Sequence, residues 1–563
     1  MAKKQIARQT ARVNTPLLFL LLVLIPLYGG YYNFSVLLAG AILVPLLLYT
    51  CLRQGTLTLP VSAPAWFLYG LWACYLVTIP FAVSVGMAMT GWLRVTVWVL
   101  FFLYAATYSP EERRSILDAV AYEGAILSLL ATVSFLYGAA NGVVDANGRI
   151  DGPFQYANTW ALYQLVCLIL LMGKPRRRLD WAAMAVLLCG ICLSGSRGTF
   201  LLVLLLGAGY GLWLLRARRA KIVALGAASA LGVGGVAVLL SGGMVWERLK
   251  AITLTSSSLN GRLLYALDGL EMILAHPLGL GRGGYLYTQP LEQRGVYVLR
   301  FIHNEYLQAS LDAGLLAGLL LGALVILLLL RREMPARERL VILAVSVHAA
   351  IDFDFQFSAA VFLLLLCGTG GKTFAVTVKK GLPVKAVCGL LTLLLTYGTL
   401  VYGLDFLGCT DAAYRLYPLD LELAERRLQS FSTVEEAQPV ADRIIKTTDL
   451  SMLAWDCKFA AATQRADVGE MVRMKYQYLR LNRYRGEVYE DFTQLLENAC
   501  AQASAEDLLL YQSMAQAIIT QLEEVNRTTR DLAYRIADRP ALEFSEEILQ
   551  RLSQITQKGS LIP

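Results

Sequence analysis

Long apolar segments recur through the first 404 residues of the sequence, and they constrain the fold more than any other feature. A helix rises 1.5 Å per residue, so about 20 apolar residues cross a hydrocarbon core of about 30 Å. The chain is 56% hydrophobic and 16% charged, which is more apolar surface than one soluble core can bury. The sequence therefore predicts an all-α polytopic membrane bundle of about 12–13 transmembrane helices. The predicted segments are residues 16–32, 34–52, 65–81, 92–108, 116–137, 154–172, 181–193, 200–215, 222–240, 306–330, 340–351, 355–370 and 384–402.

Basic residues alternate between these segments, because every second connection is cationic. The positive-inside rule places these connections in the cytoplasm, and the net charge of +8 then reflects topology rather than nucleic-acid binding. They contain Arg53 and residues 111–114, 174–178, 216–221, 331–339 and 372–385. The connections expected outside are residues 139–153, 194–199, 241–304 and 352–354. An odd number of segments also places the chain after Leu404 outside.

The N-terminus combines a basic and an apolar stretch, as a signal peptide does. However, Tyr28, Gly29 and Gly30 do not form the small-residue cleavage site that such a peptide requires. We therefore expect an uncleaved first transmembrane segment with a cytoplasmic N-terminus.

The composition becomes charged and amphipathic from Asp405 onward. We therefore expect a transmembrane domain at residues 1–404, with a long outer loop at 241–304, and an extracytoplasmic α-helical domain at 405–563. The paired helices favour either an α-solenoid resembling tetratricopeptide repeats or a helical cap without a binding role. The spacing of the cysteines here leaves a disulfide open; they are Cys409, Cys457 and Cys500. The expected helices are residues 421–428, 434–445, 452–465, 468–481, 487–503, 505–525 and 545–555.

Two arginines in the outer connections are candidate anion ligands. Arg197 lies in the small-residue turn 194–199, and its guanidinium can bind two phosphate oxygens, although anchoring to lipid headgroups is the simpler role for such an arginine. Arg262 lies near the start of an expected amphipathic helix at 260–274, where the helix dipole also favours an anion. Arg282, in a glycine-rich turn without a nucleotide-binding motif, is a weaker candidate.

A polar head at residues 301–305 precedes a stretch that reads as one continuous apolar helix to residue 330. The head carries His303, Asn304 and Glu305. A lone histidine is more often structural than catalytic, but an imidazole beside two anion-binding arginines can act in acid–base chemistry. We therefore predict His303 as the catalytic residue, with Asn304 and Glu305 as secondary candidates.

An Asp-x-Asp pair, Asp352 and Asp354, occupies another outer connection. This pair leaves a metal site conceivable, but two carboxylates without further ligands are weak evidence for one. We expect them to have a structural or acceptor-orienting role, and we expect neither a metal nor another cofactor.

Together these motifs resemble the O-antigen ligase and polymerase superfamily over residues 92–371. The resemblance lies in their order and spacing. It rests on SGSRG at 194–198, Arg262 ahead of HPLGLG at 276–281, HNEYLQ at 303–308 with Gly314 and Gly318 after it, and GPFQYANTWA at 152–161, which includes Asn158.

The resemblance implies a metal-independent, inverting membrane glycosyltransferase of the GT-C-like kind in the bacterial cytoplasmic membrane. Its donor would be a glycan on undecaprenyl diphosphate, held by Arg197 and Arg262, with His303 acting at the acceptor. The acceptor, a lipid, cell-wall polymer, protein or another glycan, stays open. The C-terminal domain could recruit it or a partner protein.

Three alternatives remain at this point. A polymerase would join repeat units of one glycan, and the motifs do not separate it from a ligase. A flippase would also need many spans and outer arginines, but the polar candidates gather at one face rather than at mid-membrane. A membrane-anchored scaffold would leave the two arginines and His303 without a role.

Overall fold

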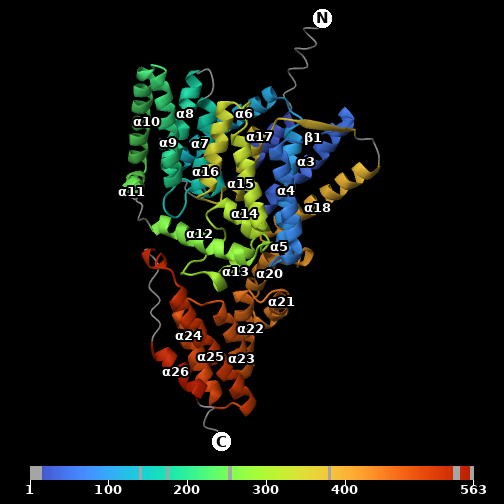
Figure 1. Cartoon of the computed structure of the whole chain (residues 1–563), viewed down its shortest axis with the longest axis vertical. Coiled ribbons are helices and arrows are strands. Elements are labelled where there is room, and N and C mark those ends of the chain that lie inside the picture. Colours follow the sequence, from blue (N-terminus) through green and yellow to red (C-terminus); the bar gives the residue numbers. More distant parts are fainter. Residues whose placement is uncertain are drawn as a thin grey trace.

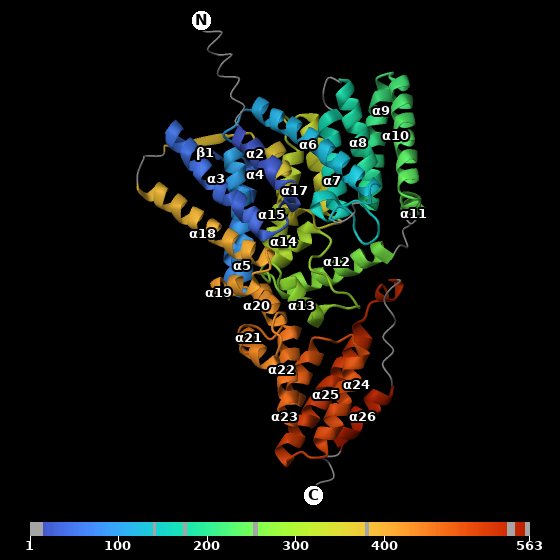
Figure 2. The same ribbon diagram turned by 180° about the vertical axis from the view of Figure 1, so that it is seen from behind.

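The computed structural model describes residues 15–138, 142–172, 177–250, 257–377, 382–536 and 546–557. The basic N-terminal stretch and parts of the connections 139–153, 174–178, 241–304 and 372–385 lie outside these ranges. A bundle of apolar helices forms one end of the molecule, and the helices from the last part of the sequence form the other end (Figures 1 and 2).

Each predicted apolar segment contains a helix, so the all-α prediction is confirmed. The first helices are α2 (Thr15–Leu24), η1 (Tyr28–Gly30), α3 (Asn33–Gln54), α4 (Ala63–Thr78), η2 (Ile79–Phe81), α5 (Val85–Ala105), α6 (Pro110–Leu136), η3 (Gly152–Phe154), α7 (Ala157–Met172), α8 (Arg178–Ser194), α9 (Arg197–Arg216) and α10 (Ala220–Leu240). They are followed by α11 (Met244–Lys250), α12 (Ser257–Ala275), α13 (Gly284–Glu292), α14 (Glu305–Ala313), α15 (Leu315–Leu329), α16 (Ala336–Ala349), η4 (Asp354–Gln356), α17 (Ser358–Gly368) and α18 (Leu382–Phe406).

Six helices within the described ranges are long and apolar enough to cross a membrane: α3, α4 with η2, α5, α6, α10 and α18. Four shorter apolar helices, α7, α9, α15 and α17, accompany them. The chain is therefore a multi-pass membrane protein, while the number of 12–13 spans stays a prediction. Helix α17 is buried along its whole length and packs on α5, where the rings of Phe101 and Phe362 stack with centroids 4.1 Å apart.

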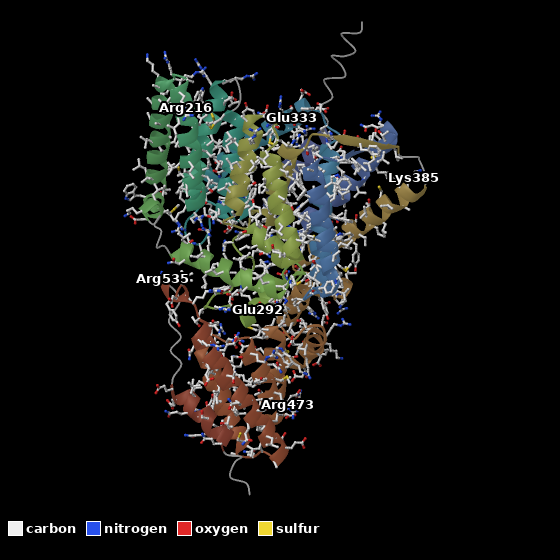
Figure 3. The ribbon with its side chains drawn as sticks, in the orientation of Figure 1. Arg216, Glu292, Glu333, Lys385, Arg473 and Arg535 are labelled. Carbon is white, nitrogen blue, oxygen red and sulfur yellow. The ribbon has the colours of Figure 1, made fainter. Side chains whose placement is uncertain are left out.

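The predicted cationic connections meet on one face of the bundle. Strand β1 (Thr56–Pro60), after α3, pairs antiparallel with β2 (Thr373–Thr377), after α17. Arg337 donates to Asp118 at 2.8 Å and so joins α16 to α6. Arg216, Glu333 and Lys385 all lie toward the end of the bundle that faces away from the C-terminal helices (Figure 3). This grouping agrees with the predicted alternation of the loops.

The prediction of one continuous helix from the polar head to residue 330 is wrong. Helix α14 ends at Ala313 and α15 begins at Leu315, because Gly314 adopts φ +89° and ψ 162°. A Cβ atom at Gly314 would lie 2.7 Å from the carbonyl oxygen of Pro277. The connection after α12 fills the break, since the backbone N–H of Leu315 donates to Pro277. Irregular backbone is tolerated in a membrane protein where other segments satisfy its hydrogen-bonding groups.

The C-terminal helices confirm the helices expected after residue 405. Successive helices pack on one another, and Val472, Tyr489, Phe492 and Leu522 lie in a shared core. Cys409 and Cys457 are free thiols. The repeat identity and the domain boundaries stay predictions. The helices are α19 (Thr410–Leu416), α20 (Leu421–Gln429), α21 (Val434–Thr447), α22 (Met452–Gln464), α23 (Val468–Arg480), α24 (Gly486–Cys500), α25 (Ala505–Thr528), η5 (Ala533–Arg535) and α26 (Glu546–Gln557).

Candidate functional site

A polar cavity of about 190 Å³ lies where the connections predicted to be outside converge. The ends of α7, α9 and α16 meet α11 and α12 around it. Four arginines and one carboxylate line it, so its surroundings carry an excess of positive charge. The lining residues are Arg149, Asn158, Gly195, Ser196, Arg197, Gly198, Arg248, Ser258, Arg262, His348, Ile351 and Asp352.

Small residues bring Arg197 to the cavity. Helix α8 ends at Ser194, the next residue Gly195 adopts the left-handed φ of +59°, and α9 begins with Arg197. At Gly198 a Cβ atom would lie 3.0 Å from the side chain of Ile351, so α9 starts in close contact with the end of α16. The helix dipole favours anions at the N-terminus of α9, which adds to the charge of Arg197.

Asp352 connects the predicted donor-binding and catalytic residues. Its Oδ2 lies 3.3 Å from Nη2 of Arg262, and its Oδ1 lies 3.2 Å from Nδ1 of His303. Tyr156 donates to Oδ1 and Asn158 to Oδ2, each at 2.7 Å. The structure thus brings Arg262, His303 and Asn158 together on one carboxylate.

The Asp352 carboxylate is held in its charged form. Burial alone would raise its pKa, but the hydrogen bond and charge of His303 and the charge of Arg262 hold that pKa well below its usual range. When Nδ1–H of His303 donates its hydrogen bond to this carboxylate, Nε2 is the ring nitrogen left to accept from another group.

A second histidine–carboxylate pair lies at the same cavity. Nδ1 of His348 is 2.6 Å from Oδ2 of Asp354, and both side chains are buried. Nε2 of His348 is 3.3 Å from the hydroxyl of Thr199, and Thr159 donates to Asp354 at 2.8 Å. The sequence placed His348 inside a span and gave no sign of this contact.

Arg149 and Arg248 are cavity residues that the sequence analysis missed. Arg149 donates to Asn158 at 2.6 Å and to the carbonyl oxygen of Ser194 at 2.8 Å. Burial and the nearby charge of Arg248 lower the pKa of Arg149, while Asp145, 3.7 Å away, opposes this shift. Their positions in the sequence could have identified them, because both are cations in connections predicted to be outside, where cations are disfavoured.

The other secondary candidates lie away from the cavity lining. Asn304 caps α14 and donates to the carbonyl oxygen of Ala350 at 2.9 Å. Buried Glu305 accepts from the backbone N–H of Phe355 at 2.7 Å. Arg282 is buried beside Gln356, with its guanidinium 5.9 Å from the ring centroid of Phe301. Glu305 and Arg282 thus join α14 and the turn before α13 to η4, whereas Asn304 joins the start of α14 to the residue after α16.

The Asp-x-Asp pair is bound by protein groups, since Asp352 holds His303 and Arg262 while Asp354 holds His348. Within the described ranges, no cluster of three or more histidine, cysteine or acidic side chains could hold a metal ion.

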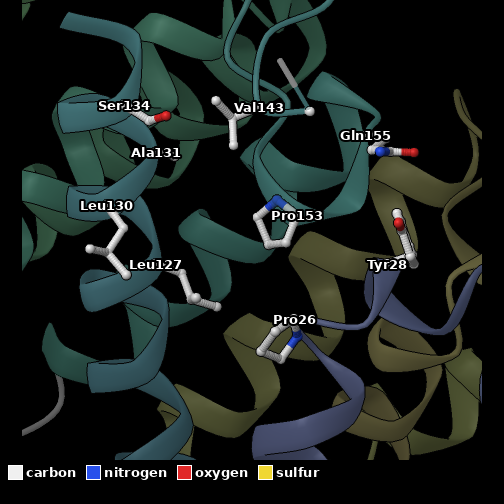
Figure 4. A pocket seen from close by; sticks show the side chains of 10 residues that line it. Pro26, Tyr28, Leu127, Leu130, Ala131, Ser134, Val143, Pro153 and Gln155 are labelled. Carbon is white, nitrogen blue, oxygen red and sulfur yellow. The ribbon is translucent and has the colours of Figure 1, made fainter. Parts of the chain in front are cut away.

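A larger cavity of about 440 Å³ lies between α2, α6 and the connection before α7 (Figure 4). It is lined by Pro26, Tyr28, Leu127, Leu130, Ala131, Ser134, Gly142, Val143, Pro153 and Gln155. These residues carry no formal charge at neutral pH, so the arginine cavity is the better candidate for ionic chemistry.

Residues 182–322 match the family model described as O-Antigen ligase. The matched segment runs from α8 into α15 and contains Arg197, Arg262 and His303, whereas Arg149, His348 and Asp352 lie outside it. No curated protein and no solved structure matches the chain.

Proposed function

From the chain's place in the O-antigen ligase and polymerase superfamily, supported by residues 182–322, we propose that it transfers a glycan from undecaprenyl diphosphate to an acceptor hydroxyl or amide. The transfer takes place on the outer face of the bacterial cytoplasmic membrane. The N-terminus is cytoplasmic and the C-terminal helices are extracytoplasmic.

The contact of Arg262 and His303 with one carboxylate, Asp352, carries this proposal. It gives a diphosphate ligand and a candidate base fixed positions relative to each other. Arg197, Arg149 and Arg248 extend the positive surface around the same cavity. Such fixed charges stabilise a leaving diphosphate without reorganisation during the reaction.

The reaction is a single displacement. The acceptor oxygen or nitrogen attacks the anomeric carbon, and the bond from that carbon to the diphosphate oxygen breaks. Undecaprenyl diphosphate leaves with the electron pair, and its added negative charge falls among Arg197 and Arg262. Nε2 of His303 takes the acceptor proton. The anomeric configuration inverts, and no metal is required.

The isoprenoid tail of the donor lies between membrane helices. The larger cavity has suitable lining, with Leu127 and Leu130 on one side and Pro153 on the other (Figure 4). The segment 149–158 separates it from the arginine cavity, because Pro153 lines one and Arg149 and Asn158 line the other.

Purified protein, incubated with a chelator and native undecaprenyl-diphosphate-linked glycan, tests the proposal. The parent should release undecaprenyl diphosphate, while His303→Ala, Arg197→Ala and Arg262→Ala should be strongly impaired. His276→Ala is a matched control, because His276 pairs with Glu292 outside the cavity lining. Product length separates ligation from polymerisation. Movement of the donor across liposomes without release, unaffected by His303→Ala, would replace the transferase with a flippase.

A further inference from the structure

Helix α12 contacts the arginine cavity with its first turns and the C-terminal helices further along. Arg262 reaches Asp352, and the ring of Tyr265 lies with its centroid 6.4 Å from that of His303. Leu264, Asp268 and Glu271 instead contact the chain between α25 and α26. Figure 1 shows α12 between the membrane bundle and the C-terminal helices.

A charged contact joins α12 to the C-terminal chain at Arg530. Its Nε donates to Asp268 at 2.9 Å and its Nη2 to Glu271 at 2.6 Å. The other oxygen of Asp268 accepts from the backbone N–H of Arg294 and the hydroxyl of Tyr297, at 2.9 and 2.7 Å. Asp268 is 1% exposed, so its negative charge is stabilised by these partners and not by water.

An apolar contact lies beside this ion pair. Leu264 and Tyr297 are buried together with Ala533 and Ile536, from η5 and the residue after it. A Cβ atom at Gly295 would lie 2.8 Å from both Ala533 and Leu264, so only glycine allows this packing. Arg535, at the end of η5, lies beside the ribbon of α12 (Figure 3).

We propose that the C-terminal helices position Arg262 for donor binding by fixing α12, and that Arg530 is the positioning residue. The inference rests on the proposed function in assigning the diphosphate to Arg262. Arg262 and Asp268 lie on one short rigid helix, so a contact at Asp268 sets where the guanidinium of Arg262 lies relative to Asp352 and His303. The C-terminal helices are thus a structural part of the donor site.

Arg530→Ala in the full chain tests this proposal, with Arg551→Ala as the matched control. Arg551 makes a comparable two-point contact with Glu497, at 2.9 and 2.8 Å, within the C-terminal helices. Hydrogen exchange of the α12 amides, measured without ligand, reports on positioning independently of activity. We expect exchange in α12 to quicken on the order of tenfold in Arg530→Ala, the equivalent of one lost charge-assisted contact, and to be unchanged in Arg551→Ala.

Kinetics with the native donor provide the second readout. Arg530→Ala should raise the KM for the lipid-linked glycan on the order of tenfold. The change in kcat should be smaller, because His303 lies just before α14 and not on α12. Arg530→Lys, which keeps the charge, should restore part of the affinity. Glu271→Gln removes the charge from one of the two carboxylates that bind Arg530, and also from the pair of Glu271 with Arg294, and it serves if Arg530→Ala does not fold.

Unchanged exchange of α12 in folded Arg530→Ala would overturn the proposal whatever the activity. Equal effects of Arg530→Ala and Arg551→Ala on KM would also overturn it, because general destabilisation would then explain the loss. If the parent has no transferase activity but α12 loosens selectively, the positioning of α12 stands and the proposed function fails.

Discussion

Asp352→Asn is the most informative single change, because it keeps the shape of the side chain and removes its charge. In the protein the carboxylate accepts from His303 and Arg262 on different oxygens. An amide presents one oxygen and one N–H₂ group, so at least one of these donors faces another donor. The imidazole can then turn or adopt the tautomer that protonates Nε2.

The size of the effect follows from the two contacts. Loss of a hydrogen bond to a charged group costs about 1.5–3 kcal/mol, and each 1.4 kcal/mol is about tenfold in rate or affinity. The contacts to His303 and Arg262 share one carboxylate and are not independent, so their effects do not simply add. We expect kcat/KM to fall by about 10²- to 10³-fold, with kcat lowered through His303 and KM raised through Arg262.

Release of undecaprenyl diphosphate from the native donor measures both parameters. Asp118→Asn is the matched control, because Asp118 pairs with Arg337 on the opposite face of the bundle. Thermal unfolding must show that both variants fold. Activity of folded Asp352→Asn within threefold of the parent would refute the reasoning, since neither contact would then matter for transfer.

Three further predictions concern other residues. Arg149→Ala and Arg248→Ala should each weaken donor binding about tenfold in a titration with undecaprenyl diphosphate, and unchanged affinity would remove them from the site. Burial raises the pKa of Asp151 to about 6, so its ionisation disfavours the folded state at neutral pH; Asp151→Asn should raise Tm at pH 7.5 and lose this gain toward pH 4, which calorimetry can check. Gly314→Ala forces a Cβ atom to 2.7 Å from the Pro277 carbonyl at a φ of +89°, so Tm should fall by several degrees, while Gly403→Ala, in open space on α18, should not lower it comparably.

Hydropathy predicted the membrane helices well because each helix satisfies its own backbone hydrogen bonds in lipid. The same reasoning failed at Gly314, where the backbone hydrogen bonds are completed by Pro277 from a distant segment. A window of apolar residues contains no information about such a partner. The glycine itself was visible, but it could equally have belonged inside a helix.

The cavity was predictable in part. Arg197 and Arg262, which line the cavity, were identified from local patterns, as was His303, which does not line it but contacts its carboxylate Asp352. Which groups touch was not predictable, because Asp352 joins Arg262 and His303 across separations of 90 and 49 residues. Local sequence fixes which end of a helix a side chain occupies, whereas packing of several helix ends decides which side chains meet.

The position of the arginines also argues for a ligand. The positive-inside rule disfavours cations in outer connections, yet Arg149, Arg197, Arg248 and Arg262 line one cavity formed by connections predicted to be outside, with Asp352 as its single lining carboxylate. Asp145 pairs with Arg149 at 3.7 Å and Asp352 is shared between Arg262 and His303, so two carboxylates face the four guanidinium groups. Four guanidinium groups around one cavity repel one another, and a bound diphosphate would turn that repulsion into attraction. The arrangement is therefore costly in the empty protein and favourable with the donor, as expected for a site selected for binding.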